Sequence, residues 1–97
     1  MTVRYERCAE DDLRDILRRS RHADPVRFTR LLRLRIAALA LYPDSGHLLG
    51  DAAVREWRLH GTPYVVLYQT RATGIDILRV LDHAWQPETA PAGGNPV

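Results

Sequence analysis

The arginines are the residues of this sequence best suited to bind charged groups, because they supply every basic side chain apart from four histidines. All 14 of the lysine-or-arginine positions are arginine. A guanidinium cannot act as a general acid or base near neutral pH, but it binds carboxylates and phosphates through paired hydrogen bonds. The formal net charge of +2 is too small to require a nucleic acid, and an acidic protein would be attracted equally well. The absence of lysine and the mild charge therefore do not by themselves identify a function.

Three of these arginines recur at every third position of the chain. Arg27, Arg30 and Arg33 define a basic strip along one side of a predicted helix. The strip has two interpretations, which the sequence leaves open. It is either the solvated side of an amphipathic helix or a surface that receives an acidic partner.

The other reactive residue types do not form a metal or disulfide pattern. His22, His47 and His60 are not spaced as metal ligands, and Cys8 is the only cysteine. The sequence therefore predicts no metal and no cofactor. Cys8 is expected to be a buried or half-buried small apolar residue rather than a reactive thiol.

Length and composition predict one domain. With 97 residues, 45% of them hydrophobic, the chain has room for a single core, which we assign to residues 1–85. Residues 86–97 hold three prolines and two glycines and are expected to form a flexible tail. No apolar run approaches the roughly 20 residues needed to cross a bilayer. A cytoplasmic protein without membrane association is therefore expected.

The N-terminal half predicts one strand and two helices. Residues 3–5 alternate as a short strand, and a helix of about three turns follows from about residue 9. Asp24-Pro25 begins a second helix, expected to end near Tyr42, because the carboxylate can accept first-turn amides and proline needs no partner there. Leu34 and Leu41 widen the apolar stripe of this helix beyond what one sheet face requires. The first helix or a bound partner must cover the surplus.

The C-terminal half predicts three strands joined by short links. Residues 43–46 form a turn and a loop is expected around Gly50, followed by strands at residues 54–59, 64–68 and 75–81. The fold class is therefore α+β. It comprises an N-terminal strand, an antiparallel two-helix hairpin and a three-stranded antiparallel meander, with the hairpin on one face of a four-stranded sheet.

Several spaced motifs in this order resemble the ParE/RelE superfamily of small bacterial toxins. The motifs are Ala9 with Asp12-Leu13 in the first helix, Leu39-x-x-x-Pro43-x-x-Gly46 at the end of the second, Arg55-Glu56, and residues 63–68 and 77–81 in the last two strands. The resemblance runs from about residue 3 to residue 85. It implies this fold and a toxin function, and the ParE-like branch is favoured.

The superfamily contains both ribosome-dependent mRNA endonucleases and ParE-type toxins that poison DNA gyrase. The endonuclease branch places basic and polar residues on the sheet, and the matching positions here are Arg55, Arg58, His60, Arg79 and His83. The sequence departs from that branch at Asp82, which occupies the usual histidine position, and at Trp85, which occupies the usual terminal arginine position. An aspartate beside a phosphate would repel it. The resemblance therefore favours a gyrase poison without catalysis of its own, with target-binding residues Arg79, His83 and Trp85.

The resemblance also implies a ParD-like antitoxin and a toxin–antitoxin hetero-oligomer. Its expected binding residues are Arg27, Arg30, Arg33, Leu34, Leu41 and Arg79. Two alternatives stay open, namely a RelE-like endonuclease that uses His83 with the three strand arginines, and a degenerate module that only binds an antitoxin. Each strand arginine also has a plain interpretation as a solvent-facing charge.

Overall fold

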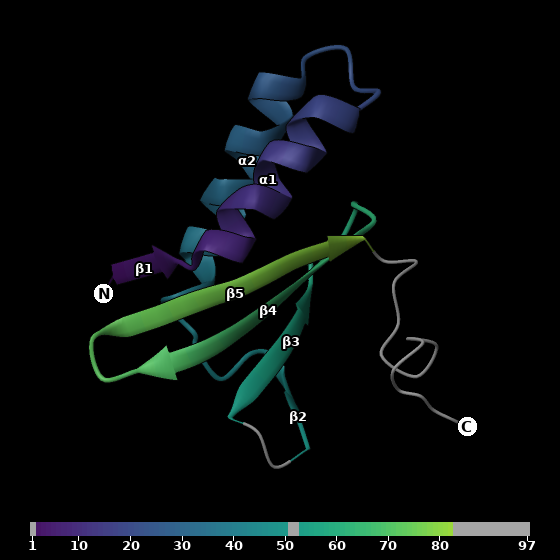
Figure 1. Ribbon diagram of the computed structural model, residues 1–97. Helices are drawn as coiled ribbons and strands as arrows, with labels where there is room; N and C mark the ends of the chain where they lie inside the picture. The colour runs from purple at the N-terminus through teal and green to yellow at the C-terminus, as the bar shows by residue number, and fades with distance from the viewer. Residues whose placement is uncertain (1, 51–52, 83–97) are drawn as a thin grey trace.

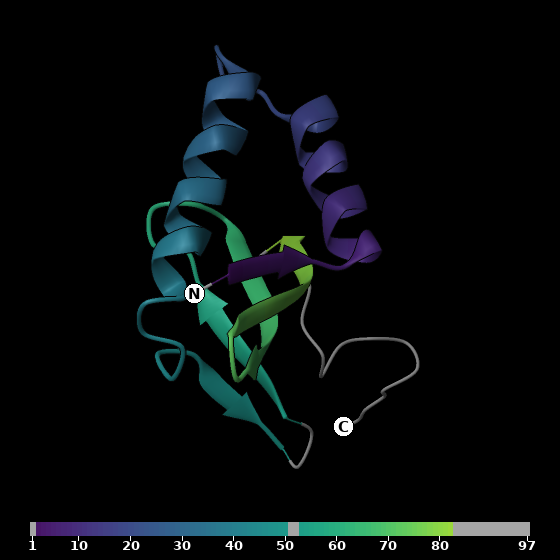
Figure 2. The same ribbon diagram turned by 90° about the vertical axis from the view of Figure 1, so that its left-hand side faces the viewer.

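The computed structural model of the chain describes residues 2–50 and 53–82. Its elements, in chain order, are β1 (Thr2–Tyr5), α1 (Arg7–Arg19), α2 (Pro25–Leu39), β2 (His47–Leu49), β3 (Val54–Arg58), β4 (Tyr64–Arg71) and β5 (Gly74–Asp82). Both helices lie on one side of a single sheet, and the chain reverses direction between them (Figures 1 and 2). The predicted tail, His83 and Trp85 lie outside the described residues.

The sheet has five strands in the order β1-β5-β4-β3-β2, rather than the four expected from the sequence. The additional strand is β2, in the segment that was expected to be a loop around Gly50. It pairs antiparallel with β3, from His47 opposite Glu56 to Leu49 opposite Val54. A strand of three residues is too short to show the alternation that identifies strands, so the pairing with β3 defines it. The expected antiparallel meander is present as β3, β4 and β5.

The helix α2 begins where the sequence predicts, but it ends earlier than predicted. The Asp24 carboxylate accepts a hydrogen bond from the backbone N–H of Arg27 at 3.1 Å, and Pro25 is the first helical residue, as expected. The α-helix ends at Leu39, not near Tyr42. The amides of residues 40–42 each donate to the carbonyl three positions earlier, at 3.0–3.1 Å, so the chain tightens before it leaves the helix.

The core lies between the helices and the sheet face that they cover. Its buried residues are Ala9, Leu13 and Ile16 of α1, Leu32, Ile36 and Leu39 of α2, Val66, Tyr68, Ile75, Ile77 and Val80 of the sheet, and Ala40 and Leu59 just after α2 and β3. The prediction for Cys8 was wrong, because its side chain is exposed. Cys8 precedes the fully buried Ala9, and one residue turns a helix by about 100°, so Cys8 points away from the core.

Strand β1 is parallel to β5, with Thr2 opposite Gly74 and Tyr5 opposite Ile77. The backbones approach so closely at the start of this pair that a Cβ atom on Gly74 would lie 1.9 Å from the carbonyl oxygen of Thr2. Only a glycine leaves room for β1 at this point. The pairing of β1 with β5 therefore requires a glycine at position 74.

A buried carboxylate fixes β1 in the same region. Asp76 is 8% exposed and accepts hydrogen bonds from Arg71 Nε at 2.6 Å and Arg4 Nη2 at 3.3 Å. Two guanidinium groups from β1 and β4 therefore compensate a charge that would be costly to bury alone.

Neither helix of the described residues has the length and apolar character that a membrane-spanning helix needs.

Candidate partner-binding site

A face of α2 carries large apolar side chains that the rest of the described chain leaves uncovered. We call this the exposed α2 face, and its apolar residues are Val26 (56% exposed), Leu31 (48%), Leu34 (61%), Leu41 (68%) and Tyr42 (71%), the last two just after the helix. The opposite side of α2 holds Leu32, Ile36 and Leu39 in the core. The surplus apolar width expected from the sequence is thus on the surface, and α1 does not cover it. Several large apolar side chains exposed along one helix are typical of interaction sites.

The predicted basic strip divides into two parts in the structure. Arg27 and Arg30 are exposed along α2. Arg33 instead places Nη2 2.7 Å from Glu10 Oε1 of α1, and its guanidinium lies 4.9 Å from the ring centroid of Tyr5. The hydrogen bond to Glu10 is the main reason that the pKa of Arg33 is raised. Arg33 therefore ties α2 to α1 and β1, whereas Arg27 and Arg30 remain exposed on the surface of α2.

Arg79 of β5 forms a bidentate ion pair with Asp12 of α1. Arg79 Nε lies 2.7 Å from Asp12 Oδ2, and Nη2 lies 3.0 Å from Oδ1. The backbone N–H of Val80 also donates to Asp12 Oδ2 at 2.9 Å. The pKa of Arg79 is raised chiefly by its hydrogen bond to Asp12. The arginine that the sequence assigns to both antitoxin and target binding is thus held against α1.

We expect the Arg79–Asp12 pair to be energetically coupled. A double-mutant cycle of Asp12→Ala and Arg79→Ala, followed by urea denaturation, should give a coupling of about 1 kcal/mol, because the pair is bidentate and Asp12 is largely shielded from solvent. The partial exposure of Arg79 keeps the value well below that of a buried pair. Strictly additive losses in the free energy of unfolding would contradict this.

Arg55 and Tyr68 together fix the loop that follows α2. Arg55 Nη1 donates to the carbonyl of Gly46 at 2.8 Å. The Tyr68 hydroxyl donates to the Pro43 carbonyl at 2.7 Å and accepts from the Gly46 N–H at 2.8 Å. A Cβ on Gly46 would lie 2.6 Å from this hydroxyl. The Leu39-x-x-x-Pro43-x-x-Gly46 motif is therefore a packing motif, and burial raises the pKa of Tyr68.

Tyr68→Phe is expected to lower the free energy of unfolding by about 2 kcal/mol, since it leaves the Pro43 carbonyl and the Gly46 amide without their shared partner. Guanidinium denaturation monitored by circular dichroism measures the loss. Tyr42→Phe is the matched control, because the Tyr42 side chain is 71% exposed and its hydroxyl is open to water. Equal stabilities of the two variants would contradict the anchoring role.

The residues matched to the endonuclease branch lie at separate places. Arg55 binds the loop after α2, and Arg79 is paired with Asp12. Arg58 is exposed at the end of β3, and β4 separates its strand from that of Arg79, which places the two strands about 10 Å apart. His60 is exposed in the turn after β3, and its carbonyl accepts a hydrogen bond from Arg35. His83 lies outside the described residues.

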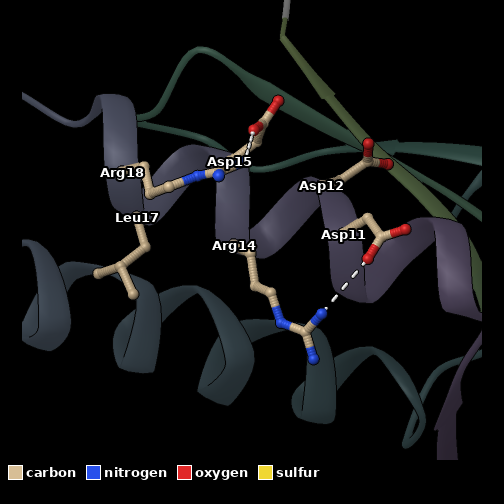
Figure 3. Close-up of a pocket in the computed structure, with 6 residues that line it drawn as sticks. All are labelled: Asp11, Asp12, Arg14, Asp15, Leu17 and Arg18. Atoms are coloured by element: carbon tan, nitrogen blue, oxygen red, sulfur yellow. Dashed lines mark hydrogen bonds and ion pairs between the residues drawn. The ribbon is translucent and has the colours of Figure 1, made fainter.

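Surface hollows lie along two sides of α1. The first, of about 440 Å³, runs along its outer side, where Arg14 contacts Asp11 at 3.5 Å and Arg18 contacts Asp15 at 2.6 Å (Figure 3). Paired surface charges of this kind are typical of a solvated helix face. The second, of about 430 Å³, lies between α1 and the end of β5. Figure 3 shows Asp12 and Asp15 on the side of α1 nearest β5, while Leu17 points toward α2.

Comparison with known proteins decides the family. The family model described as the ParE toxin of the type II toxin–antitoxin system parDE matches residues 3–87. The chain belongs to the ParE toxin family. The match covers the region in which the sequence motifs occur and confirms the predicted superfamily and branch.

A solved structure shares the ParE fold of this chain. It is a chain of the chromosomal ParDE toxin–antitoxin system from P. aeruginosa, with 19% sequence identity and a TM-score of 0.70. The alignment covers 84% of the present ParE chain and 95% of the other. No curated protein matches the sequence.

Two residues of this ParE chain have roles that the sequence does not reveal. In the sequence, Asp12 stands out only as part of a motif in the first helix. In the structure, its carboxylate binds both Arg79 and the β5 backbone. Glu10 has no motif and fixes Arg33. Both partners are distant in sequence, so local patterns carry no signal for these contacts.

Proposed function

We propose that this ParE chain is the toxin of a ParDE-type pair and that it acts in the cytoplasm by binding and trapping DNA gyrase, without catalysis of its own. Family membership supports the toxin role. The internal contacts of Arg55 and Arg79 support binding over RNA cleavage, because each guanidinium already serves an acceptor of the chain itself. Phosphoryl chemistry on RNA needs an accessible cation together with a proton acceptor and donor.

A ParD-like antitoxin neutralises the toxin by covering the exposed α2 face. This face is the observation that carries the proposal, since it combines Leu31, Leu34 and Leu41 with the arginines Arg27 and Arg30 at the N-terminal end of α2. Leu31 and Leu34 are three residues apart, which places them on one side of the helix, and the exposed Leu41 follows just after its end. The matching partner is an amphipathic helix with an apolar stripe and flanking carboxylates, and the product is a toxin–antitoxin hetero-oligomer.

A DNA supercoiling assay with purified gyrase tests the toxin activity. The expected result is inhibition of supercoiling with accumulation of cleaved DNA, reversed by an excess of the ParD-like antitoxin. A parallel assay with translating ribosomes and message provides the contrast. Ribosome-dependent cleavage of the message would replace this proposal with a RelE-like endonuclease, and inactivity in both assays would indicate a degenerate antitoxin-binding module.

Calorimetric titration of the toxin with the antitoxin at several temperatures tests the binding face. Burial of the leucines should give a strongly negative heat capacity change. A value near zero would contradict apolar burial at this face.

A further inference from the structure

The centre of the exposed α2 face combines leucines with small side chains. One residue turns an α-helix by about 100°, so six exposed residues of α2 fall within an arc of about 120°. They are Arg27, Arg30, Leu31, Leu34, Ala37 and Ala38. The two alanines let another helix approach the α2 backbone closely, and the leucines beside them are the kind of side chain that fills the space between two packed helices.

The charges on this face are placed against the dipole of their own helix. Arg27 lies in the first turn of α2 and Arg30 follows one turn later, near the positive end of the dipole, while the last turn holds no basic residue. Among the described residues, neither arginine side chain forms an ion pair. On the exposed side, an antiparallel helix would bring its negative C-terminal end to these arginines. It would complement α2 fully if it also had a basic N-terminal half, and a second α2 has both properties.

The apolar residues of α2 are also complementary to a second α2. When two antiparallel copies cross at Leu34, this residue meets its own counterpart. Leu31 of each copy then lies opposite the small residues Ala37 and Ala38 of the other copy. A large side chain therefore faces a small one on both sides of the crossing point, as close helix packing requires.

The two ends of the exposed α2 face match in the same arrangement. Arg27 lies seven residues before Leu34 and Tyr42 lies eight residues after it, so each Arg27 comes opposite the Tyr42 of the other copy. The Tyr42 side chain is 71% exposed and accessible to a partner. An arginine over a tyrosine ring is a favourable contact that this chain also uses internally, where Arg33 lies 4.9 Å from the ring centroid of Tyr5.

We propose that the free toxin pairs with a second copy of itself through the exposed α2 face, with the two α2 helices antiparallel and crossing at Leu34. Both copies then use the same residues around a two-fold axis. One helix from each copy makes a small interface, so the pair is weak, with a dissociation constant on the order of 10 μM. The pairing does not depend on the target of the toxin. Its competition with the antitoxin rests on the proposed function, because both partners use the same leucines.

Two other arrangements of two copies fit less well. Parallel α2 helices would set Arg27 and Arg30 against the same residues of the other copy, and like charges repel. Pairing through the β2 edge would use a strand of only three residues, in which Leu48 is the one large apolar side chain that is exposed. Such a short edge provides little apolar surface to bury.

Sedimentation equilibrium of the free toxin tests the pairing. We expect a reversible monomer–dimer equilibrium, and Leu34→Glu should raise its dissociation constant about tenfold or more, because two carboxylates would meet at the two-fold axis. Leu48→Glu is the matched control and should leave the constant within about twofold of the parent value. A toxin that stays monomeric at about 200 μM, or a dimer that Leu34→Glu leaves intact, would overturn the proposal. Antitoxin binding and gyrase inhibition are measured separately, so either result leaves the proposed function standing.

Thiol crosslinking tests the orientation of the helices. Cys8 is exposed and is the only cysteine, so Cys8→Ser provides the background. In an antiparallel pair the two copies of residue 27 lie about 21 Å apart along the helices, since each is seven residues from the crossing point. A short bismaleimide should therefore join Arg27→Cys to Tyr42→Cys in a mixture of the two variants, and should not join Arg27→Cys to itself. Crosslinking of Arg27→Cys to itself would indicate parallel helices and would overturn the proposal.

The same crosslink tests the competition between the two partners. Saturating ParD-like antitoxin, added before the reagent, should reduce the crosslinked product about tenfold or more, because it occupies the exposed α2 face. Undiminished crosslinking in the presence of bound antitoxin would overturn the competition.

Discussion

Gly74→Ala is expected to release β1 from the sheet and to cost about 3 kcal/mol or more of folding free energy. The added Cβ would lie 1.9 Å from the Thr2 carbonyl oxygen and 2.8 Å from the Thr2 nitrogen, both of them backbone atoms that cannot rotate away. The strand must therefore move. Its displacement would also separate Arg4 from the buried Asp76, so the carboxylate would lose one of its compensating guanidinium groups. Guanidinium denaturation measures the loss.

Gly50→Ala is the matched control for this substitution. Gly50 has a positive φ of 55°, but nothing lies within 4 Å of its added Cβ. Its replacement is expected to cost only about 1 kcal/mol, from the left-handed backbone alone. Amide exchange in residues 2–5 separates the two variants, because it should accelerate in Gly74→Ala and stay unchanged in Gly50→Ala. Similar stabilities and similar exchange would show that β1 adapts to the side chain.

Leu34→Glu is expected to weaken antitoxin binding about a hundredfold while leaving the free toxin folded. The side chain is 61% exposed in the free protein, so a glutamate there is solvated and its folding cost is small. In the complex the carboxylate would have to enter an apolar contact and face the acidic rim of the partner. An interface centre of this kind commonly contributes 2 kcal/mol or more per residue, and about 2.7 kcal/mol corresponds to a hundredfold change.

Leu48→Glu is the matched control for the α2 variant. Leu48 is also an exposed leucine, at 49%, but it lies on β2 outside the exposed α2 face. We expect its affinity for the antitoxin to stay within about twofold of the parent toxin. If both variants bind equally well, the antitoxin does not use α2. If both lose binding, the interface extends to the β2 edge of the sheet.

The sequence predicts those elements whose signals are local. Asp24-Pro25 locates the start of α2 because the capping carboxylate and the proline act within one turn. The strand at residues 64–68 is visible from its unbroken apolar run, and the structure extends it to Arg71. The surplus apolar residues Leu34 and Leu41 are visible from their spacing, and they are exposed in the structure.

Strands and ion pairs whose partners are distant in the chain cannot be predicted from local sequence patterns. β2 is a strand because β3 pairs with it, and its three residues carry no pattern of their own. Arg79 looks like a free cation on a strand until α1 brings Asp12 against it, 67 positions earlier in the chain. Arg33 looks equivalent to Arg27 and Arg30 by spacing, yet only Arg33 faces Glu10. Tertiary packing therefore decides which arginines are available to a partner.

The parallel pairing of β1 with β5 has a consequence for biosynthesis. Thr2 of β1 pairs with Gly74 of β5, about seventy residues later in the chain, so the ribosome must synthesise β5 before this side of the sheet can form. Contacts of such long sequence separation slow folding, because a large loop must be closed before they form. A nascent chain therefore remains without its β1–β5 pairing until β5 has been synthesised, and its sheet matures late.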